Sequence, residues 1–239
     1  MVKKYCPYCN EKNMKKLLVR EKLGMRAIHN LFPTCRGHLT IIPREHRIRE
    51  FTDITDSLLE DLFDILKELI GFFHSENTLI FWYQGMGKTL EHFHIHFLPM
   101  IPPTFWRAVL DRENRQYKVI SPVVFPFRVI RDIAELNSDE AISLLRRVRQ
   151  QQKDLAITSP DGVTSIWVQI KGWDRTLSCF NLFPREKGDN LIQARSQEEK
   201  AAGPNKETVY SWVKELKSEI AKKNRLFDRD QFGPGGEVL

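Results

Sequence analysis

Three histidines alternate with apolar residues in the segment His92-Phe93-His94-Ile95-His96-Phe97. This is the period-two pattern of a half-buried β-strand, on which successive side chains point to opposite faces of a sheet. The three imidazoles therefore lie on one face, and the apolar side chains enter a hydrophobic core on the other. Packing alone rarely places three histidines in register on one face, so the pattern indicates a strand that carries function.

The spacing of these histidines limits what they can do together. Successive residues on one face of a strand are ~6.8 Å apart, whereas a zinc-bound imidazole nitrogen lies ~2 Å from the metal. One ion would strain to reach all three rings. The spacing favours a division of labour in which an end histidine binds a metal, the middle one performs chemistry and the third orients or contacts a leaving group. A catalytic metal bound by all three is the alternative.

The N-terminal segment Cys6-Pro7-Tyr8-Cys9 has the two-residue gap that lets two thiolates bind one tetrahedral metal ion. A redox pair is the rival interpretation, but that motif follows a strand and opens a helix, for which residue 6 leaves no room. His92 and His46 are the candidates for the remaining ligands, and His38 is a weaker alternative to His46. Two cysteines and two histidines would form a closed, structural site.

Hydrophobic periodicity predicts a strand, a helix and two further strands in the first half of the chain. The strand spans residues 39–42 and stops before Pro43, and the helix begins near Ser57 and ends at Gly71. The two later strands span 78–84 and 90–98.

The second half repeats this order. We expect a strand at 128–130, a helix from Ser138, and strands at 166–169 and 176–184. The order predicts a duplicated strand–helix–strand–strand unit, and coincidence between two hairpins is the alternative. We expect domains at 1–104 and 105–190, and a C-terminal helix and tail at 191–239.

Two sequence matches support the duplication. Trp167 matches Trp82 in a shared Trp-x-Gln pattern. The segment 176–184 matches the segment that begins at Thr89, which aligns Phe180 with Phe93. The second match has a slightly larger offset than the first, and we attribute the difference to the length of the intervening loop.

Composition narrows the class of protein. The 239 residues are 41% hydrophobic and 28% charged, which excludes a disordered or fibrous chain. The apolar runs at 69–73 and 79–83 are far shorter than the ~20 residues of a membrane span. No apolar stretch follows the N-terminal lysines, so we expect no signal peptide, no membrane contact and a cytoplasmic location.

The excess positive charge is local. The formal net charge is +6, and residues 1–26 alone hold eight basic and two acidic side chains. A nucleic-acid-binding domain usually carries a basic face over much of its surface, so a nucleic-acid partner is not expected. The local excess favours either an anionic ligand near the N-terminus or a solvated edge.

The segment 92–98, His-Phe-His-Ile-His-Phe-Leu, resembles the motif of the histidine triad (HIT) superfamily. The stretch from Asn30 to His46 resembles that family's first strands, and the resemblance runs from about Tyr5 to Pro99. Tandem duplication with an N-terminal Cys-x-x-Cys is similar to the branch of galactose-1-phosphate uridylyltransferase and diadenosine tetraphosphate phosphorylase. The resemblance implies an α+β fold of two HIT-like repeats, with antiparallel sheets, helices packed on one side and a degenerate second repeat.

The resemblance also implies residue roles. His94 matches the nucleophile that attacks the α-phosphorus of a nucleotide, and His96 matches the residue that contacts the phosphate or leaving group. The implied zinc ligands are Cys6, Cys9, His46 and His92. The implied substrate-contacting residues are Asn30, Gln84, Lys88 and Thr89. Asn30 matches a ribose contact, Thr89 a phosphate contact, and Lys88 a position where many members carry Gln.

Three departures qualify this resemblance. The uridylyltransferases carry Gln where this chain has His96, which is more similar to the hydrolases. The usual Asn-x-Gly before the triad is replaced by Tyr83-Gln84-Gly85. In the second repeat, the triad positions become Cys179, Asn181 and Phe183, so that copy has no nucleophile and serves as an internal partner.

The function that the resemblance implies is a nucleotidyl hydrolase or transferase. It would act on a nucleotide, nucleotide sugar or dinucleoside polyphosphate through a covalent nucleotidyl-histidine, with a structural zinc ion, as a monomer or homodimer. The alternative is a non-catalytic, zinc-stabilised module of HIT-like fold that senses or binds nucleotides. The missing Asn-x-Gly, the degenerate second copy and the basic N-terminus motivate that alternative.

Overall fold

The computed structural model describes residues 6–30, 32–35, 37–73, 77–85, 90–99, 123–130, 132–159, 162–170, 179–184 and 204–231. The helices are α1 (Glu11–Leu17), α2 (Asp56–Phe73), α4 (Ser138–Thr158) and α6 (Lys206–Gln231). The strands are β1 (Leu18–Glu21), β2 (Met25–His29), β3 (Leu39–Pro43), β4 (Asn77–Gln84), β5 (Ile95–Pro99), β6 (Val123–Val124), β7 (Val163–Ile170) and β8 (Phe180–Pro184).

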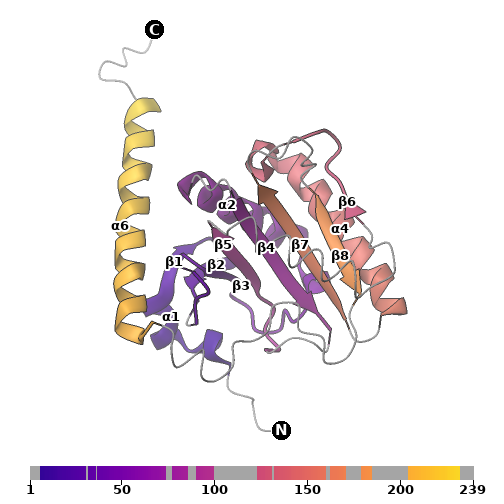
Figure 1. The fold of residues 1–239 in the computed structure, drawn as a ribbon, viewed down its shortest axis with the longest axis horizontal. Helices are drawn as coiled ribbons and strands as arrows, with labels where there is room; N and C mark the ends of the chain where they lie inside the picture. The colour runs from indigo at the N-terminus through magenta and orange to yellow at the C-terminus, as the bar shows by residue number, and fades with distance from the viewer. Residues whose placement is uncertain are drawn as a thin grey trace.

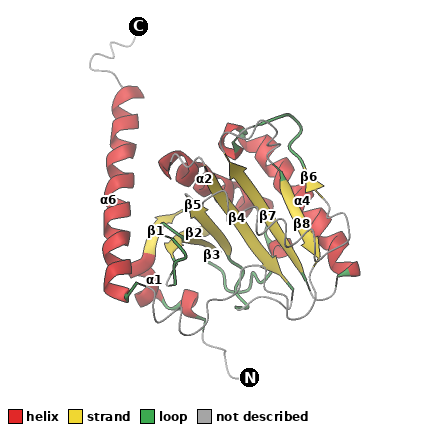
Figure 2. Cartoon of the chain, viewed as in Figure 1, coloured by secondary structure: helices red, strands yellow, loops and turns green. Residues whose placement is uncertain are grey.

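The strands form one antiparallel sheet in the order β1-β2-β3-β5-β4-β7-β8-β6. Helices α2 and α4 cover one face of it, and α6 lies at the β1 edge beside α1 (Figures 1 and 2). The predicted α+β class with an antiparallel sheet is confirmed. The helices are not all on one side as predicted, because α1 and α6 pack on the face opposite α2 and α4. No helix among the described residues is long and apolar enough to cross a membrane.

The main core lies between the sheet and the helices α2 and α4. Alternate strand residues, among them Ile80, Trp82, Ile95 and Phe97, point into this core and are fully buried. A second, smaller core lies on the other face, under α1 and α6. Its buried members are Met14, Leu17, Ile28, Ile42 and Val209.

The strand order divides into two halves, β1-β2-β3-β5-β4 and β7-β8-β6, which meet where β4 pairs with β7. In that pairing, Trp82 lies opposite Ser165, and Ile80 lies opposite Trp167. If Trp167 is the counterpart of Trp82 in the second half, then Ser165 is the counterpart of Ile80. Replacing each residue by its counterpart turns the first pair into the second. A two-fold axis between β4 and β7 produces this exchange of partners. The arrangement is the one expected of a duplicated unit; the duplication and the domain boundaries stay predictions.

The pairing corrects the predicted alignment of the second hairpin. Ile95 of β5 lies opposite Trp82, and Phe180 of β8 lies opposite Trp167. Phe180 is therefore the counterpart of Ile95 in the sheet, and the predicted alignment of Phe180 with Phe93 is wrong. A slip of two residues keeps every side chain on the same face, so the alternating pattern alone does not detect it.

The corrected register changes which residues occupy the triad positions of the second half. The counterpart of His94 is Cys179, and the counterpart of His96 is Asn181. Phe183, which was predicted as a triad position, corresponds instead to an apolar residue of β5. The prediction that no histidine occupies the counterparts of His94 and His96 still holds.

Several predicted boundaries also move. Helix α2 continues through Gly71 to Phe73, because a helical glycine with open space beside it need not end a helix. The described part of 128–130 contains no strand; the paired residues of that region are Val123–Val124. Strand β5 begins only at Ile95, so two of the three histidines precede it.

Gly162 precedes β7 with a φ of 129°, and a Cβ atom there would lie 2.1 Å from the carbonyl oxygen of Gln84. We predict that Gly162→Ala lowers the free energy of unfolding by at least about 2 kcal/mol, through backbone strain and this clash. Gly71→Ala is the control and should raise it by about 0.5–1 kcal/mol, since Gly71 is helical and has open space. Urea unfolding measures both, and equal effects would contradict the prediction.

Candidate functional site

The histidines lie on the sheet face opposite the main core. Phe93, Ile95 and Phe97 enter the core, so the residues between them point the other way. The rings of His94 and His96 are 5.1 Å apart, and His96 stacks on Phe81 at 4.6 Å with an interplanar angle of 11°. The predicted histidine face is therefore present, although only His96 belongs to strand β5.

His94 is held in one tautomer by the backbone. Its Nδ1 lies 3.0 Å from the carbonyl oxygen of His92, which can only accept a hydrogen bond. Nδ1 therefore carries the proton and donates it, and in the neutral ring Nε2 carries the lone pair. The side chain is 7% exposed. This geometry makes Nε2 of His94 a nucleophile or a base.

His96 is oriented by another histidine, His38. The backbone N–H of Thr34 donates to His38 Nδ1 at 3.1 Å, so a neutral His38 ring carries its proton on Nε2. That nitrogen lies 3.0 Å from His96 Nδ1 and donates to it. Burial, and then the neighbouring His94 and His38, hold the pKa of His96 well below its usual range, so its ring is neutral. His96 Nε2 is therefore a hydrogen-bond donor.

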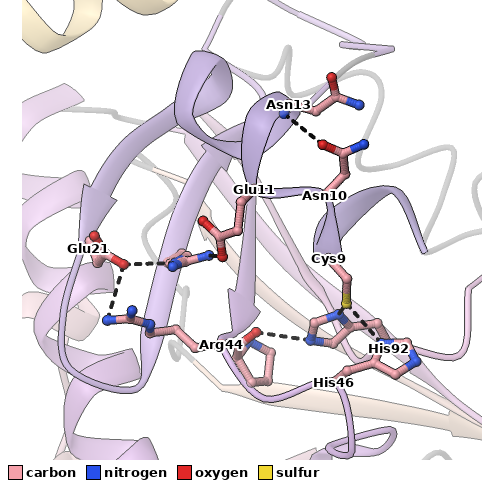
Figure 3. Close-up of polar contacts among 10 residues, drawn as sticks. Cys9, Asn10, Glu11, Asn13, Glu21, Arg44, His46 and His92 are labelled. Carbon is pink, nitrogen blue, oxygen red and sulfur yellow. Dashed lines mark hydrogen bonds and ion pairs between the residues drawn. The ribbon is translucent and has the colours of Figure 1, made fainter. Parts of the chain in front are cut away.

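The four predicted metal ligands meet in one cluster. One ligand atom from each lies within 4.8 Å of all the others, and the members are Cys6, Cys9, His46 and His92. The Sγ of Cys9 is 3.1 Å from His46 Nδ1 and 3.6 Å from His92 Nδ1 (Figure 3). Tetrahedral zinc with ordinary bond lengths separates sulfur and nitrogen ligands by about 3.6 Å. The residues present therefore fit a four-coordinate metal ion.

His92 joins this cluster to the histidine face. Its Nε2 donates to the carbonyl oxygen of Pro43 at 2.9 Å, which leaves Nδ1 directed at the cysteines (Figure 3). Burial, and next the adjacent His46, lower the pKa of His92 to about 4, so the ring is neutral and able to bind a metal. A hydrogen bond on the far nitrogen is the usual way that proteins orient a metal-binding imidazole.

Asn30 lies on the histidine face, close to His96. Its Nδ2 donates to Thr40 Oγ1 at 2.9 Å, and Thr40 lies directly opposite His96 in the β3–β5 pairing. The backbone N–H of Phe32 donates to Asn30 Oδ1 at 2.8 Å. These bonds fix the amide beside the histidines, as a substrate-contacting residue requires.

The other three predicted substrate contacts are not brought to this site by the described residues. In the alternation of β4, Gln84 shares the face of Ile80 and Trp82, which packs against the helices, and it is 6% exposed. This strand position separates Gln84 from the histidine face. Lys88 and Thr89 lie outside the described residues.

The sequence reasoning missed two residues of the site. It considered His38 only as a metal ligand, and the structure places its ring against His96 instead. It did not single out Tyr8, whose ring lies 5.7 Å from that of His94. The available signal for Tyr8 was its position between two predicted ligands, Cys6 and Cys9.

Three of the basic residues in the N-terminal segment are paired with carboxylates. Arg20 and Lys22 form ion pairs with Glu68 of α2, and Arg26 forms ion pairs with Glu11 and Glu21. Figure 3 shows the Glu21 carboxylate between two guanidinium groups. This pairing favours the solvated edge over an anion site as the interpretation of the local charge.

Comparison with known proteins gives one family match, in the first part of the chain. Residues 11–102 match the HIT domain family, and no match was found among curated protein sequences. An ADP-glucose phosphorylase from Arabidopsis thaliana with bound ADP-glucose is similar in structure, at 16% identity and a TM-score of 0.57, over 89% of this chain and 91% of that one.

Two other solved structures share the fold. A uridylyltransferase matches at 14% identity and a TM-score of 0.52, over 84% of this chain and 86% of that one. A GalT-like protein from Arabidopsis thaliana matches at 18% identity and a TM-score of 0.50, over 70% of this chain and 76% of that one.

We predict that the purified protein binds about one zinc ion per chain, and that Cys9→Ser or His46→Asn weakens this binding at least about 10-fold because each removes one of four ligands. Cys35→Ser is the control, since the Cys35 thiol donates to the carbonyl of Pro99 and lies outside the cluster. Elemental analysis after dialysis against a chelator measures the retained metal. Full retention in Cys9→Ser would contradict the assignment.

Proposed function

We propose that this protein, whose residues 11–102 match the HIT domain family, is a nucleotidyl hydrolase or transferase that forms a covalent intermediate on His94. The substrate is a nucleotide, a nucleotide sugar or a dinucleoside polyphosphate, attacked at its α-phosphorus. The observation that carries the proposal is the hydrogen bond from His94 Nδ1 to the His92 carbonyl, which leaves the lone pair on Nε2.

The reaction has two displacement steps. In the first, His94 Nε2 forms a bond to the α-phosphorus, and the bond from phosphorus to the leaving-group oxygen breaks. The electron pair leaves with that oxygen. In the second step, water, phosphate or a sugar phosphate attacks the same phosphorus and releases the imidazole. The neutral form of His94 is required, because an imidazolium ring has no free lone pair on nitrogen with which to attack phosphorus.

His96 assists through its remaining donor. The hydrogen bond from His38 occupies His96 Nδ1, so Nε2–H is the group that faces the reacting phosphate. A neutral donor stabilises the negative charge that develops on a phosphate or leaving-group oxygen without repelling an adjacent imidazolium. Asn30 holds the ribose in this proposal, and the phosphate contacts of Lys88 and Thr89 follow from the resemblance alone.

The metal ion is structural zinc in this proposal. All four ligands come from the protein, namely Cys6, Cys9, His46 and His92, so no coordination position is left for substrate. With a metal ion bound, these ligands would join the N-terminal segment, the segment after β3 and the segment before β5. The ion would act by fixing the position of His92, whose backbone carbonyl orients the His94 ring.

The fold comparison supports the reaction class. The similar structures include proteins named as a phosphorylase of ADP-glucose and a uridylyltransferase. We propose that the enzyme is cytoplasmic.

Strand β7 pairs with β4 over its whole length, so this edge of the first unit cannot pair with a second copy of the chain. We therefore propose that a monomer is enough to form the complete site.

We predict that incubation with a panel of nucleotides, nucleotide sugars and dinucleoside polyphosphates produces an intact-mass increase of one nucleotidyl group. His94→Ala should abolish this adduct and reduce turnover below about 0.1% of wild type, because no other residue replaces a covalent nucleophile. His29→Gln is the control, since that buried histidine bonds the Asn30 carbonyl and its ring lies 5.9 Å from that of Trp212, tilted by 48°. Nucleotide binding without an adduct or turnover across the panel would instead favour the non-catalytic module.

We predict that His38→Phe lowers kcat about 10- to 100-fold, because the His96 ring loses the donor that sets its tautomer. Adduct formation on His94 should slow in proportion, whereas zinc content should not change. Single-turnover kinetics and thermal unfolding of both proteins separate this effect from lost stability. An unchanged kcat in a folded His38→Phe protein would refute the tautomer role.

A further inference from the structure

Tyr8 occupies the turn between the two cysteines of the metal cluster. The turn is a short 3-10 helix, Pro7–Cys9, that places the Tyr8 ring over the histidine face. The ring centroid lies 5.7 Å from that of His94 and 6.3 Å from that of His92. Among the described aromatic contacts, Tyr8 is the residue that touches both the proposed nucleophile and a predicted metal ligand.

The hydroxyl end of Tyr8 reaches a different part of the site. It is hydrogen-bonded to the side chain of Thr40. Thr40 also accepts from Asn30 Nδ2 at 2.9 Å. Tyr8 thus contacts His94 with its ring and connects to Asn30 through one hydroxyl.

His94 needs such support because of its place in the chain. Strand β5 begins at Ile95, so the backbone of His94 lies outside the hydrogen-bonded strand. The bond to the His92 carbonyl selects the tautomer of the ring, and the ring also lies edge-on to that of His96 at 5.1 Å. A further aromatic ring at contact distance restricts the tilt of the imidazole, and a misplacement of about 1 Å can cost roughly 100-fold in rate.

We propose that Tyr8 is a positioning residue of this site: its ring orients the imidazole of His94, and its hydroxyl, through Thr40, orients Asn30. The inference rests on the proposed function and adds a residue to it. Because Cys6 and Cys9 flank Tyr8 in sequence, the metal cluster holds both ends of the turn that presents the ring. The cluster thus acts on the nucleophile by two routes, through the His92 carbonyl and through Tyr8.

The two ends of the side chain give separable effects. Tyr8→Leu removes the ring, so kcat and the rate of adduct formation should fall about 10- to 100-fold. Tyr8→Phe keeps the ring and should restore kcat to within about 2-fold of wild type. It should raise KM several-fold, because Thr40, the partner of Asn30, loses its bond to the hydroxyl. Steady-state and single-turnover kinetics measure these changes.

Tyr210 provides the matched control. Tyr210 belongs to α6 and packs against the same small core as Tyr8. Its ring lies under the ammonium group of Lys16. Tyr210→Leu and Tyr210→Phe should leave kcat, KM and zinc content within about 2-fold of wild type. Zinc content in the Tyr8 variants should also stay at the wild-type level, since all four ligands remain.

A spectroscopic readout is independent of turnover. In protein labelled with ¹⁵N-histidine, two-bond ¹H–¹⁵N spectra report the tautomer and environment of each ring. We expect the His94 signals to shift or broaden in zinc-bound Tyr8→Leu and to stay near wild type in Tyr8→Phe. If wild type shows no adduct and no turnover, the proposed function fails, and the spectra still test Tyr8.

Some results would overturn the inference. These are unchanged kcat, adduct rate and His94 signals in Tyr8→Leu, or a loss of kcat in Tyr8→Phe as large as that in Tyr8→Leu. If Tyr8→Leu does not fold, Tyr8→Phe decides alone, and an unchanged KM there would overturn the role of the hydroxyl.

Discussion

The hydrogen bond from His94 Nδ1 to the backbone carbonyl of His92 is the interaction on which the site depends. It makes Nε2 the reactive nitrogen of His94. The ring of His92 is itself fixed, because Nε2 donates to Pro43 and Nδ1 lies against the cysteines. His92 therefore combines two roles: its backbone orients the proposed nucleophile, and its side chain anchors that backbone to the metal cluster.

Neutral imidazoles in fixed tautomers are the common feature of this site. A charged His96 would repel a second positive ring, and burial beside His94 and His38 lowers its pKa and prevents that charge. The Thr34 N–H and the His38 ring together determine which nitrogen of His96 donates. The proton position of His94 thus follows from a backbone carbonyl, whereas that of His96 follows from the ring of His38 and the backbone N–H that orients it.

Much of this site was predictable from local patterns. The alternation around His94 predicted the histidine face, and the gap between Cys6 and Cys9 predicted half of a metal cluster. Its completion by His46 required the segment after β3 to approach the N-terminus, which no local pattern encodes. The contact between His38 and His96 was missed for the same reason. The two residues are 58 positions apart in the chain and are adjacent only in the folded protein.

The sequence by itself determined which side chains of the 92–97 segment enter the core, and it placed the thiols of Cys6 and Cys9 at metal-binding spacing. These follow from the two-residue period of an extended chain, a property of neighbouring residues. Only the tertiary structure decided the register of the second hairpin, the start of β5 at Ile95 and the place of Tyr8 over His94. A two-residue slip preserves every facing pattern, so register is settled by which strands pair and by how the distant segments pack.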